Sequence, residues 1–209
     1  TPLPPDAEIA VEGPEHPWVS RGGVKLAAGL DAFGVDPAGR VCLDVGASTG
    51  GFTDVLLSRG AARVYAIDVG HGQLHARLRS DPRVVLREGV NARLLSRAEV
   101  PEACSLLVAD VSFISLRLIL PAAVPLLSPG ADAVLLVKPQ FESERGEVGR
   151  GGIVRDPDVR RRALERVVAA AEALGLAHRG TVESPITGAD GNVELLAAFR
   201  LGGPGAGSG

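Results

Sequence analysis

Short, nearly uninterrupted apolar runs alternate along this chain with helical segments, and this alternation restricts the fold more than any other feature. A strand that helices cover on both sides of a parallel sheet reads as a continuous apolar run. The pattern therefore predicts an α/β fold, with a mostly parallel sheet between two layers of helices. The predicted strands are residues 40–46, 62–68, 83–88, 104–110 and 132–138, with a late strand at 191–199.

Helical spacing and end signals predict four helices around these strands, at residues 20–34, 52–60, 116–127 and 156–175. The last helix has the clearest boundaries. Asp156 is a preferred N-cap residue, Pro157 suits the first helical position, and Gly175 suits the C-terminal end.

The length of 209 residues allows one domain with a substantial core. Residues 1–18 are rich in proline and acidic residues and are predicted to be a linker, whereas residues 19–201 form the predicted folded domain. The glycine-rich residues 202–209 are predicted to be a disordered tail. Methionine is absent even from position 1, so we expect a fragment or a processed chain that lacks an N-terminal segment.

Composition argues against several classes of protein. The formal net charge of −3 disfavours nonspecific nucleic-acid binding through the overall field, while leaving room for local basic patches. The most apolar stretch, residues 118–137, is interrupted by prolines and by Asp132, so it is not a transmembrane helix. Cys42 and Cys104 lie in apolar runs without metal-ligand spacing, which is typical of buried thiols in a reducing compartment. We therefore expect a cytoplasmic protein with no membrane partner.

The segment LDVGASTGGFTD, residues 43–54, carries the strongest local signal for a ligand. A predicted strand containing Asp44 leads into a glycine-rich turn and then a helix, which leaves free backbone N–H groups and lets a ligand approach the backbone. Asp68 ends the next strand, 24 residues after Asp44, where a carboxylate can bind two ribose hydroxyls. A turn with a purely structural role is the simpler alternative.

The glycine spacing indicates which nucleotide ligand fits this turn. The glycines read G-x-x-x-G-G, whereas the fingerprint of dinucleotide dehydrogenases is G-x-G-x-x-G. Asp44 also suits an amino-acid ammonium better than a pyrophosphate, which favours S-adenosylmethionine over a nicotinamide cofactor. Asn91 follows the third strand and is expected near the adenine. The predicted cofactor contacts are Asp44, Gly46, Ala47, Ser48, Thr49, Gly50, Gly51, Phe52, Thr53, Asp68, Asn91 and Asp110.

Lysine is almost absent from this chain. Of the 22 basic residues only Lys25 and Lys138 are lysine, so 20 are arginine. Lysine can lose its proton in a suitable environment, while arginine keeps its proton. Lys138 interrupts the end of a buried strand, where a charge needs a task or a partner. Asp110 ends the adjacent strand, so both side chains should face the crevice beyond the carboxyl ends of the strands. Biased composition is the alternative explanation.

Several sequence blocks, found in order from about residue 18 to residue 199, resemble the TlyA family of RNA ribose methyltransferases, historically labelled hemolysins. The clearest are SRGGVKLAAGLDAFG, CLDVGASTGGFTDVLLSRGAARVYAIDVGHGQL, DPRVV, VADVSFISL, LLVKPQFE, GGIVRD and GNVELL. The resemblance implies a Rossmann-like, class I S-adenosylmethionine-dependent methyltransferase fold. It implies a mostly parallel, seven-stranded sheet with an antiparallel late strand and helices on both faces.

The resemblance also implies a catalytic tetrad shared with FtsJ-like 2′-O-methyltransferases. By motif, its members are Lys25 in RGGVKL, Asp110 in VADVSF, Lys138 in LLVKPQF and Glu194 in GNVELL. The two lysines singled out by composition are the two in this pattern. The substrate implied is a cytidine ribose 2′-hydroxyl of ribosomal RNA, free or in a ribosomal subunit.

The chain departs from the family pattern in two places. The family usually begins with a small N-terminal RNA-binding domain, which we expect to be missing from this chain together with its contribution to RNA affinity and target selection. The family segment near GYGQLAWKL reads GHGQLHARL here, which adds His71 and His75. These histidines lie at i and i+4, but no third ligand is evident, so we predict no metal site.

We hypothesise that Lys138, as a free amine, accepts the proton of the ribose hydroxyl. Lys25 would orient the nucleophile, and Asp110 and Glu194 would hold the lysines in place. Arginines are the candidates for RNA phosphates, although a solvated loop is an equal alternative for most of them. The predicted RNA-binding residues are Arg21, Arg145, Arg150 and Arg155.

Three other functions remain open from the sequence. A pore-forming hemolysin would need an amphipathic or spanning segment, which the prolines of residues 118–137 disfavour. A cofactor-binding protein that has lost turnover would bind S-adenosylmethionine without transferring its methyl group. A dehydrogenase would need to bind a nicotinamide cofactor.

Overall fold

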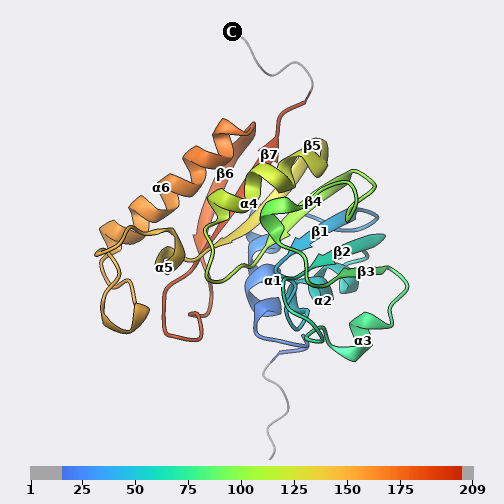
Figure 1. Ribbon diagram of the computed structural model, residues 1–209, viewed down its shortest axis with the longest axis horizontal. Helices are drawn as coiled ribbons and strands as arrows, with labels where there is room; N and C mark the ends of the chain where they lie inside the picture. The colour runs from blue at the N-terminus through green and yellow to red at the C-terminus, as the bar shows by residue number, and fades with distance from the viewer. Residues whose placement is uncertain (1–15, 204–209) are drawn as a thin grey trace, which may run out of the picture.

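The computed structural model describes residues 16–203, which form one seven-stranded sheet in the order β3-β2-β1-β4-β5-β7-β6 (Figure 1). The predictions for residues 1–15 and 204–209 lie outside the described residues. All neighbouring strands pair in parallel except β7, which is antiparallel to both β5 and β6. The strands are β1 (Val41–Val45), β2 (Arg63–Ile67), β3 (Val84–Arg87), β4 (Cys104–Ala109), β5 (Leu127–Val137), β6 (Leu176–Glu183) and β7 (Leu195–Leu201).

Helices cover both faces of this sheet, as predicted (Figure 1). Helices α1 (Gly22–Phe33) and α2 (Gly51–Ser58) pack on one face, and α4 (Leu116–Ala123) and α6 (Pro157–Ala173) pack on the other. The shorter helical elements are α3 (Ala76–Arg79), α5 (Pro139–Glu142), η1 (Ala92–Leu94), η2 (Val124–Leu126) and η3 (Arg150–Gly152).

The strands are continuously apolar because successive residues pack into two different hydrophobic cores, one on each face of the sheet. In β1, Leu43 and Val45 face the core shared with α4 and α6, while Cys42 faces the core shared with α1 and α2. Strand β5 divides Leu135 and Leu136 between the two cores in the same way. Each fully buried leucine of this kind contributes about 1.5–3 kcal/mol of hydrophobic stabilisation.

The sequence prediction missed one strand and misplaced the ends of several elements, including the start of β5, which is Leu127 and not residue 132. Strand β6 was not located, because it is an edge strand with a half-exposed pattern and a register shift near Gly180. The predicted helix 116–127 was too long: α4 ends at Ala123, η2 follows, and β5 begins at Leu127. The late strand begins at Leu195 rather than at residue 191.

The topology brings five strand ends to one edge of the sheet. Parallel pairing places Val45 of β1 beside both Ile67 of β2 and Ala109 of β4. Strand β7 runs the other way, so its first residue, Leu195, pairs with Val137, the last residue of β5. Residues that follow β1, β2, β4 and β5, and residues that precede β7, therefore meet at this edge. Within residues 16–203, every helix is too short or too polar to cross a membrane.

Candidate functional site

Each of the two lysines forms an ion pair with one carboxylate at the carboxyl edge of the sheet. The Nζ atom of Lys138 lies 2.6 Å from Oδ1 of Asp110, and the Nζ atom of Lys25 lies 2.5 Å from Oε2 of Glu194. Lys25 is 8% exposed, Lys138 is 9% exposed and Glu194 is 3% exposed. Two buried cations are thus balanced by two carboxylates, as buried charges require.

Local structure explains how four distant residues reach this edge. Asp110 directly follows β4, and Lys138 directly follows β5 and precedes Pro139, the first residue of α5. Lys25 lies in the first turns of α1. Glu194 precedes β7, which corrects the expectation that it lies within the late strand.

A small cavity joins the two ion pairs to the glycine-rich turn. This cavity of about 110 Å³ is bordered by Lys25, Asp110 and residues of the turn between β1 and α2. Lys25 also borders a second cavity of about 520 Å³, which includes Trp18 and Arg21. The amine of Lys25 therefore lies between the turn and an open hollow on the surface.

Gly46 and Gly51 of the turn leave no room for a side chain, because other segments of the chain approach their Cα atoms closely. Gly46 has φ of +84°, and a Cβ atom there would lie 2.2 Å from the carbonyl oxygen of Asp110. A Cβ atom on Gly51 would lie 2.3 Å from Oγ of Ser20, at the start of α1. The turn is thus fitted against both the loop after β4 and the segment that carries Lys25.

A larger cavity of about 700 Å³ begins at Gly46 and Ser48 and extends along the ends of β1, β2 and β4. In this cavity Asp68 accepts hydrogen bonds from the N–H groups of Ser48 (2.7 Å) and Gly70 (2.8 Å), one on each carboxylate oxygen. Asn91 also lines the cavity, with its Oδ1 accepting from the N–H of Arg93. Each oxygen of Asp68 keeps lone pairs for a further donor.

Asp44 lies beneath the cavity wall and borders none of the three cavities. It is fully buried, its Oδ2 accepts a hydrogen bond of 2.6 Å from Oγ1 of Thr53, and its Oδ1 has no partner among the described residues. Burial raises the pKa of Asp44 to about 7; the Thr53 hydroxyl opposes this shift, and the nearby Asp110 and Asp68 add to it. Direct contact of Asp44 with a cofactor ammonium stays a prediction.

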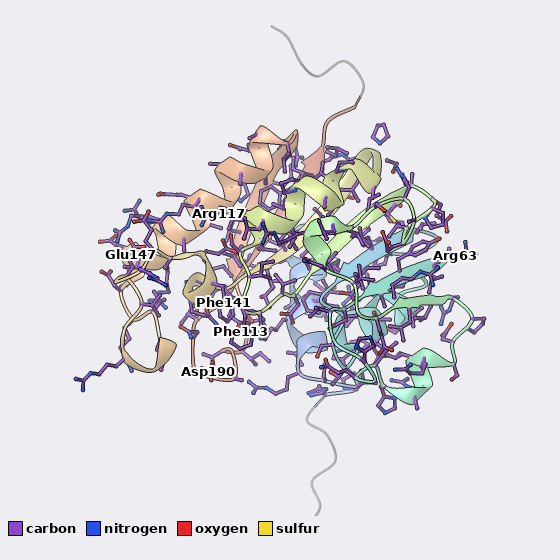
Figure 2. All side chains as sticks on the ribbon, in the orientation of Figure 1. Arg63, Phe113, Arg117, Phe141, Glu147 and Asp190 are labelled. Atoms are coloured by element: carbon purple, nitrogen blue, oxygen red, sulfur yellow. The ribbon has the colours of Figure 1, made fainter. Side chains whose placement is uncertain are left out.

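Phe113 is a feature of the site that the sequence reasoning missed. It is 92% exposed, has φ of +65°, and borders the large cavity next to Ser112. Its ring lies 5.2 Å, centroid to centroid, from that of Phe141 in α5 (Figure 2). A non-glycine residue held at positive φ and almost fully exposed is unusual. The only sequence signal was its place in VADVSF, two residues beyond Val111.

The predicted RNA-binding arginines fall into two places. Arg21 borders the second cavity and donates a hydrogen bond of 3.2 Å to the carbonyl of Thr187. Arg145, Arg150 and Arg155 are exposed, and none forms an ion pair within residues 16–203. Asn192 lies two residues before Glu194 and connects the loop of these arginines to it. Its Oδ1 accepts a hydrogen bond from the N–H of Val154, and its Nδ2 donates one to the carbonyl of Gly152.

His71 and His75 each make local contacts of their own. His75 is the N-cap of α3 and accepts from the N–H of Arg77, while His71 lies against Gly89. Among the described residues there is no group of three or more His, Cys, Asp or Glu side chains that could hold a metal ion.

Comparison with known proteins places the chain in a family. Residues 18–201 match the FtsJ-like methyltransferase family. Over 194 residues the chain is 54% identical to 16S/23S rRNA (cytidine-2′-O)-methyltransferase TlyA of Mycobacterium tuberculosis, a match that covers 93% of this chain and 72% of that one. It is 46% identical to hemolysin A of Brachyspira hyodysenteriae, covering 88% of this chain and 77% of that protein.

Solved structures agree with this assignment. The crystal structure of a protein described as a hemolysin from Lactococcus lactis has a TM-score of 0.85 to this chain. The two are 47% identical, and the match covers 88% of each chain. The N-methyltransferase NodS of Bradyrhizobium japonicum has a TM-score of 0.58 at 20% identity, over 85% of this chain and 92% of that one, which shows a common methyltransferase fold. The chain therefore belongs to the FtsJ-like methyltransferase family.

Proposed function

We propose that this protein transfers a methyl group from S-adenosylmethionine to a ribose 2′-hydroxyl of ribosomal RNA, at a cytidine. The observation that carries the proposal is the pairing of both lysines with carboxylates at the sheet edge, where one residue of each pair, Lys25 and Asp110, borders the small cavity. The name of the relative from Mycobacterium tuberculosis supports the choice of ribosomal RNA and cytidine. Such a substrate would place the protein in the cytoplasm.

The cavity residues fit S-adenosylmethionine. The cavity of about 700 Å³ has the size of a small-molecule site. The free lone pairs of Asp68 suit two ribose hydroxyls, and the amide of Asn91 suits a purine edge. The glycine-rich turn exposes its backbone, to which the amino-acid moiety could bind. Glycine is needed at position 46, because a side chain there would collide with Asp110. When bound, S-adenosylmethionine supplies an electrophilic sulfonium methyl group.

The protein then needs to align the ribose oxygen and remove its proton. We assign proton removal to Lys138, whose amine as a free base would take the hydroxyl proton while the oxygen forms its bond to the methyl carbon and the carbon–sulfur bond breaks. Lys25 would hold the oxygen in line. Asp110 and Glu194 would keep the two amines in place through their ion pairs, and Lys138 would have to give up a proton before it acts as the base.

Arg145, Arg150 and Arg155 would bind RNA phosphates, since their side chains are exposed and lack carboxylate partners within the described residues. Replacing all three by alanine should weaken RNA binding about tenfold or more at low salt and flatten the log K versus log salt slope by about two. Affinity for S-adenosylmethionine should not change. Filter binding at several salt concentrations measures the RNA affinity and the salt slope.

A matched control removes three arginines that already pair with carboxylates. The triple variant carries the same change of net charge but should keep the RNA affinity and the salt slope. Equal losses in both triple variants would assign the effect to bulk charge instead of the loop. The control residues are Arg59, Arg63 and Arg161.

The function itself is tested by incubating the protein with methyl-labelled S-adenosylmethionine and ribosomal RNA or ribosomal subunits. We expect label at one cytidine whose 3′-phosphodiester resists alkaline cleavage, because a methylated 2′-oxygen cannot attack the phosphate. Cofactor binding without transfer would instead indicate a protein without turnover. Binding of a nicotinamide cofactor, or lysis of red cells without transfer, would favour the dehydrogenase or the hemolysin.

A further inference from the structure

Two loops at the active edge are joined by a series of contacts that runs through the proposed catalytic residues. One loop follows β4 and the other follows β5. Asp110 pairs with Lys138, and Lys138 donates a hydrogen bond of 2.9 Å to Oγ of Ser112. Phe113 then stacks at a tilt on Phe141. Each contact joins a residue just after β4 to a residue just after β5.

We propose that Glu142, at the end of this series, is a positioning residue that fixes the loop after β4 relative to the amine of Lys138. This inference rests on the proposed function, because it assigns the consequence of that positioning to methyl transfer. Glu142 is the last residue of the block LLVKPQFE, but no role was assigned to it from the sequence.

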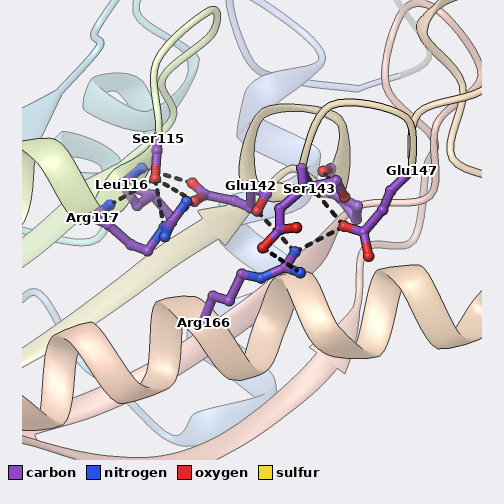
Figure 3. A network of polar contacts seen from close by, with 9 residues as sticks. Ser115, Leu116, Arg117, Glu142, Ser143, Glu147 and Arg166 are labelled. Atoms are coloured by element: carbon purple, nitrogen blue, oxygen red, sulfur yellow. Dashed lines mark hydrogen bonds and ion pairs between the residues drawn. The ribbon is translucent and has the colours of Figure 1, made fainter.

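The carboxylate of Glu142 clamps the first turn of α4. Its Oε2 accepts a hydrogen bond of 2.5 Å from Oγ of Ser115, and its Oε1 accepts one of 2.6 Å from the N–H of Leu116 (Figure 3). Ser115 is the N-cap of α4, so Glu142 satisfies a helix N–H that has no partner within the helix. A carboxylate is also favoured at a helix N-terminus.

Glu142 is itself held firmly. It is 2% exposed, and its backbone carbonyl accepts a hydrogen bond of 3.4 Å from Arg166 of α6. Nε of Arg117 approaches its Oε2 to 3.5 Å (Figure 3). Burial raises the pKa of Glu142, while Ser115, Leu116 and Arg117 oppose that shift. A carboxylate buried at this depth needs all of these donors, so its position is closely determined.

The geometry links this clamp to the base. The loop between Asp110 and Ser115 is anchored at its first residue by Lys138 and at its last by Glu142. Ser112, which meets the amine of Lys138, lies between these anchors, as does the exposed Phe113. Without the second anchor, Ser112 would lose its fixed place, and the amine of Lys138 would lose its hydrogen bond to Ser112.

The test compares Glu142→Ala with Asp132→Ala. Asp132 is a matched control: it is also a buried carboxylate, and it lies in β5, but it pairs with Arg40 and Arg200 away from the site. We expect Glu142→Ala to lower kcat for methyl transfer about 10–100-fold, because displacements near 1 Å can cost about 100-fold. KM for S-adenosylmethionine should stay within about twofold. Asp132→Ala should leave kcat unchanged once both proteins are compared well below their melting temperatures.

Two further measurements separate positioning from a general loss of stability. In a double-mutant cycle, Ser112→Ala should lower kcat in the wild-type background and much less in the Glu142→Ala background, since both act on one amine. Glu142→Gln keeps an acceptor for the N–H of Leu116 and should restore most of the activity. If Glu142→Ala fails to fold, Ser115→Ala removes one of the two clamp bonds and should still lower kcat several-fold.

Amide hydrogen exchange tests the clamp independently of turnover. Residues 111–117 should exchange about tenfold faster or more in Glu142→Ala than in wild type or Asp132→Ala, while residues 44–53 keep their protection. Unchanged exchange in this segment would overturn the inference, even if the wild-type protein shows no methyl transfer. With an active wild type, unchanged kcat in Glu142→Ala and Ser115→Ala, or strictly additive effects in the cycle, would overturn it and leave the proposed function intact.

Discussion

Replacing Lys138 by arginine is expected to reduce methyl transfer by about 10²–10⁴-fold in kcat, the usual contribution of a general base. The substitution keeps the positive charge and nearly the same reach, so the ion pair with Asp110 can persist. A guanidinium does not give up its proton at any working pH and therefore cannot accept another. Single-turnover kinetics with saturating S-adenosylmethionine and RNA measures the chemical step directly.

Lys25→Arg is the matched control for this experiment. Lys25 has a similar exposure and its own carboxylate partner, Glu194, but the proposed mechanism asks it only to orient the nucleophile. An arginine can still donate hydrogen bonds there, so a smaller loss, about tenfold, is expected. Calorimetry should show unchanged cofactor binding in both variants. Retained transfer by a folded, cofactor-binding Lys138→Arg protein would remove Lys138 as the base.

The sheet and the lysine pairs could be predicted because they follow from strong local signals. Strands buried on both faces leave continuous apolar runs, and the carboxyl ends of parallel strands meet at one edge. Lysine was rare enough that Lys25 and Lys138 stood out, and the structure gives each of them a carboxylate at that edge. The pairing itself was not specified, because it depends on the order of β4, β5 and β7 across the sheet and on the packing of α1 against β7.

Features that depend on long-range packing could not be predicted in this way. Strand β6 lies at the edge of the sheet, where half-exposed residues leave no apolar run. Glu142 reads as an ordinary polar residue after Phe141, and its burial depends on α4 and α6, which are distant in sequence. Phe113 received no role from the sequence, and the structure places it at positive φ and almost fully exposed in the loop after β4.

The environment of Asp44 differs from the one expected from the sequence. The expectation was a carboxylate facing a ligand, but the structure buries it fully, and one of its oxygens has no partner within residues 16–203. Burial without a cation favours the neutral acid, which is why the pKa of Asp44 rises from 3.8 to about 7. The free energy of unfolding should therefore depend on pH in a range where ordinary aspartates no longer titrate.

The sign follows from proton linkage. The folded state binds the Asp44 proton more tightly than the unfolded state, so this stabilisation is complete below about pH 4 and is lost as pH rises through about 7. Between pH 5 and pH 8 the wild type should lose about 2–3 kcal/mol of unfolding free energy relative to Asp44→Asn, which cannot titrate at this position. Urea unfolding at both pH values measures this difference, and only the change with pH is compared, because the amide shifts the baseline equally at each pH.

Thr53→Val provides the internal control for this linkage. The hydroxyl of Thr53 donates to Oδ2 of Asp44 and lowers the pKa of that carboxyl, so its removal should move the loss of stability to higher pH. A parallel pH dependence in wild type, Asp44→Asn and Thr53→Val would mean that Asp44 is already ionised in the folded protein at pH 5. An ionised Asp44 at full burial needs a cation or further donors beside its free oxygen, so that result would assign it a partner in the protein itself. A loss of stability in the wild type that is absent from Asp44→Asn and moves to higher pH in Thr53→Val would instead mean that Asp44 is protonated in the folded protein and ready to ionise when a positively charged ligand binds above it.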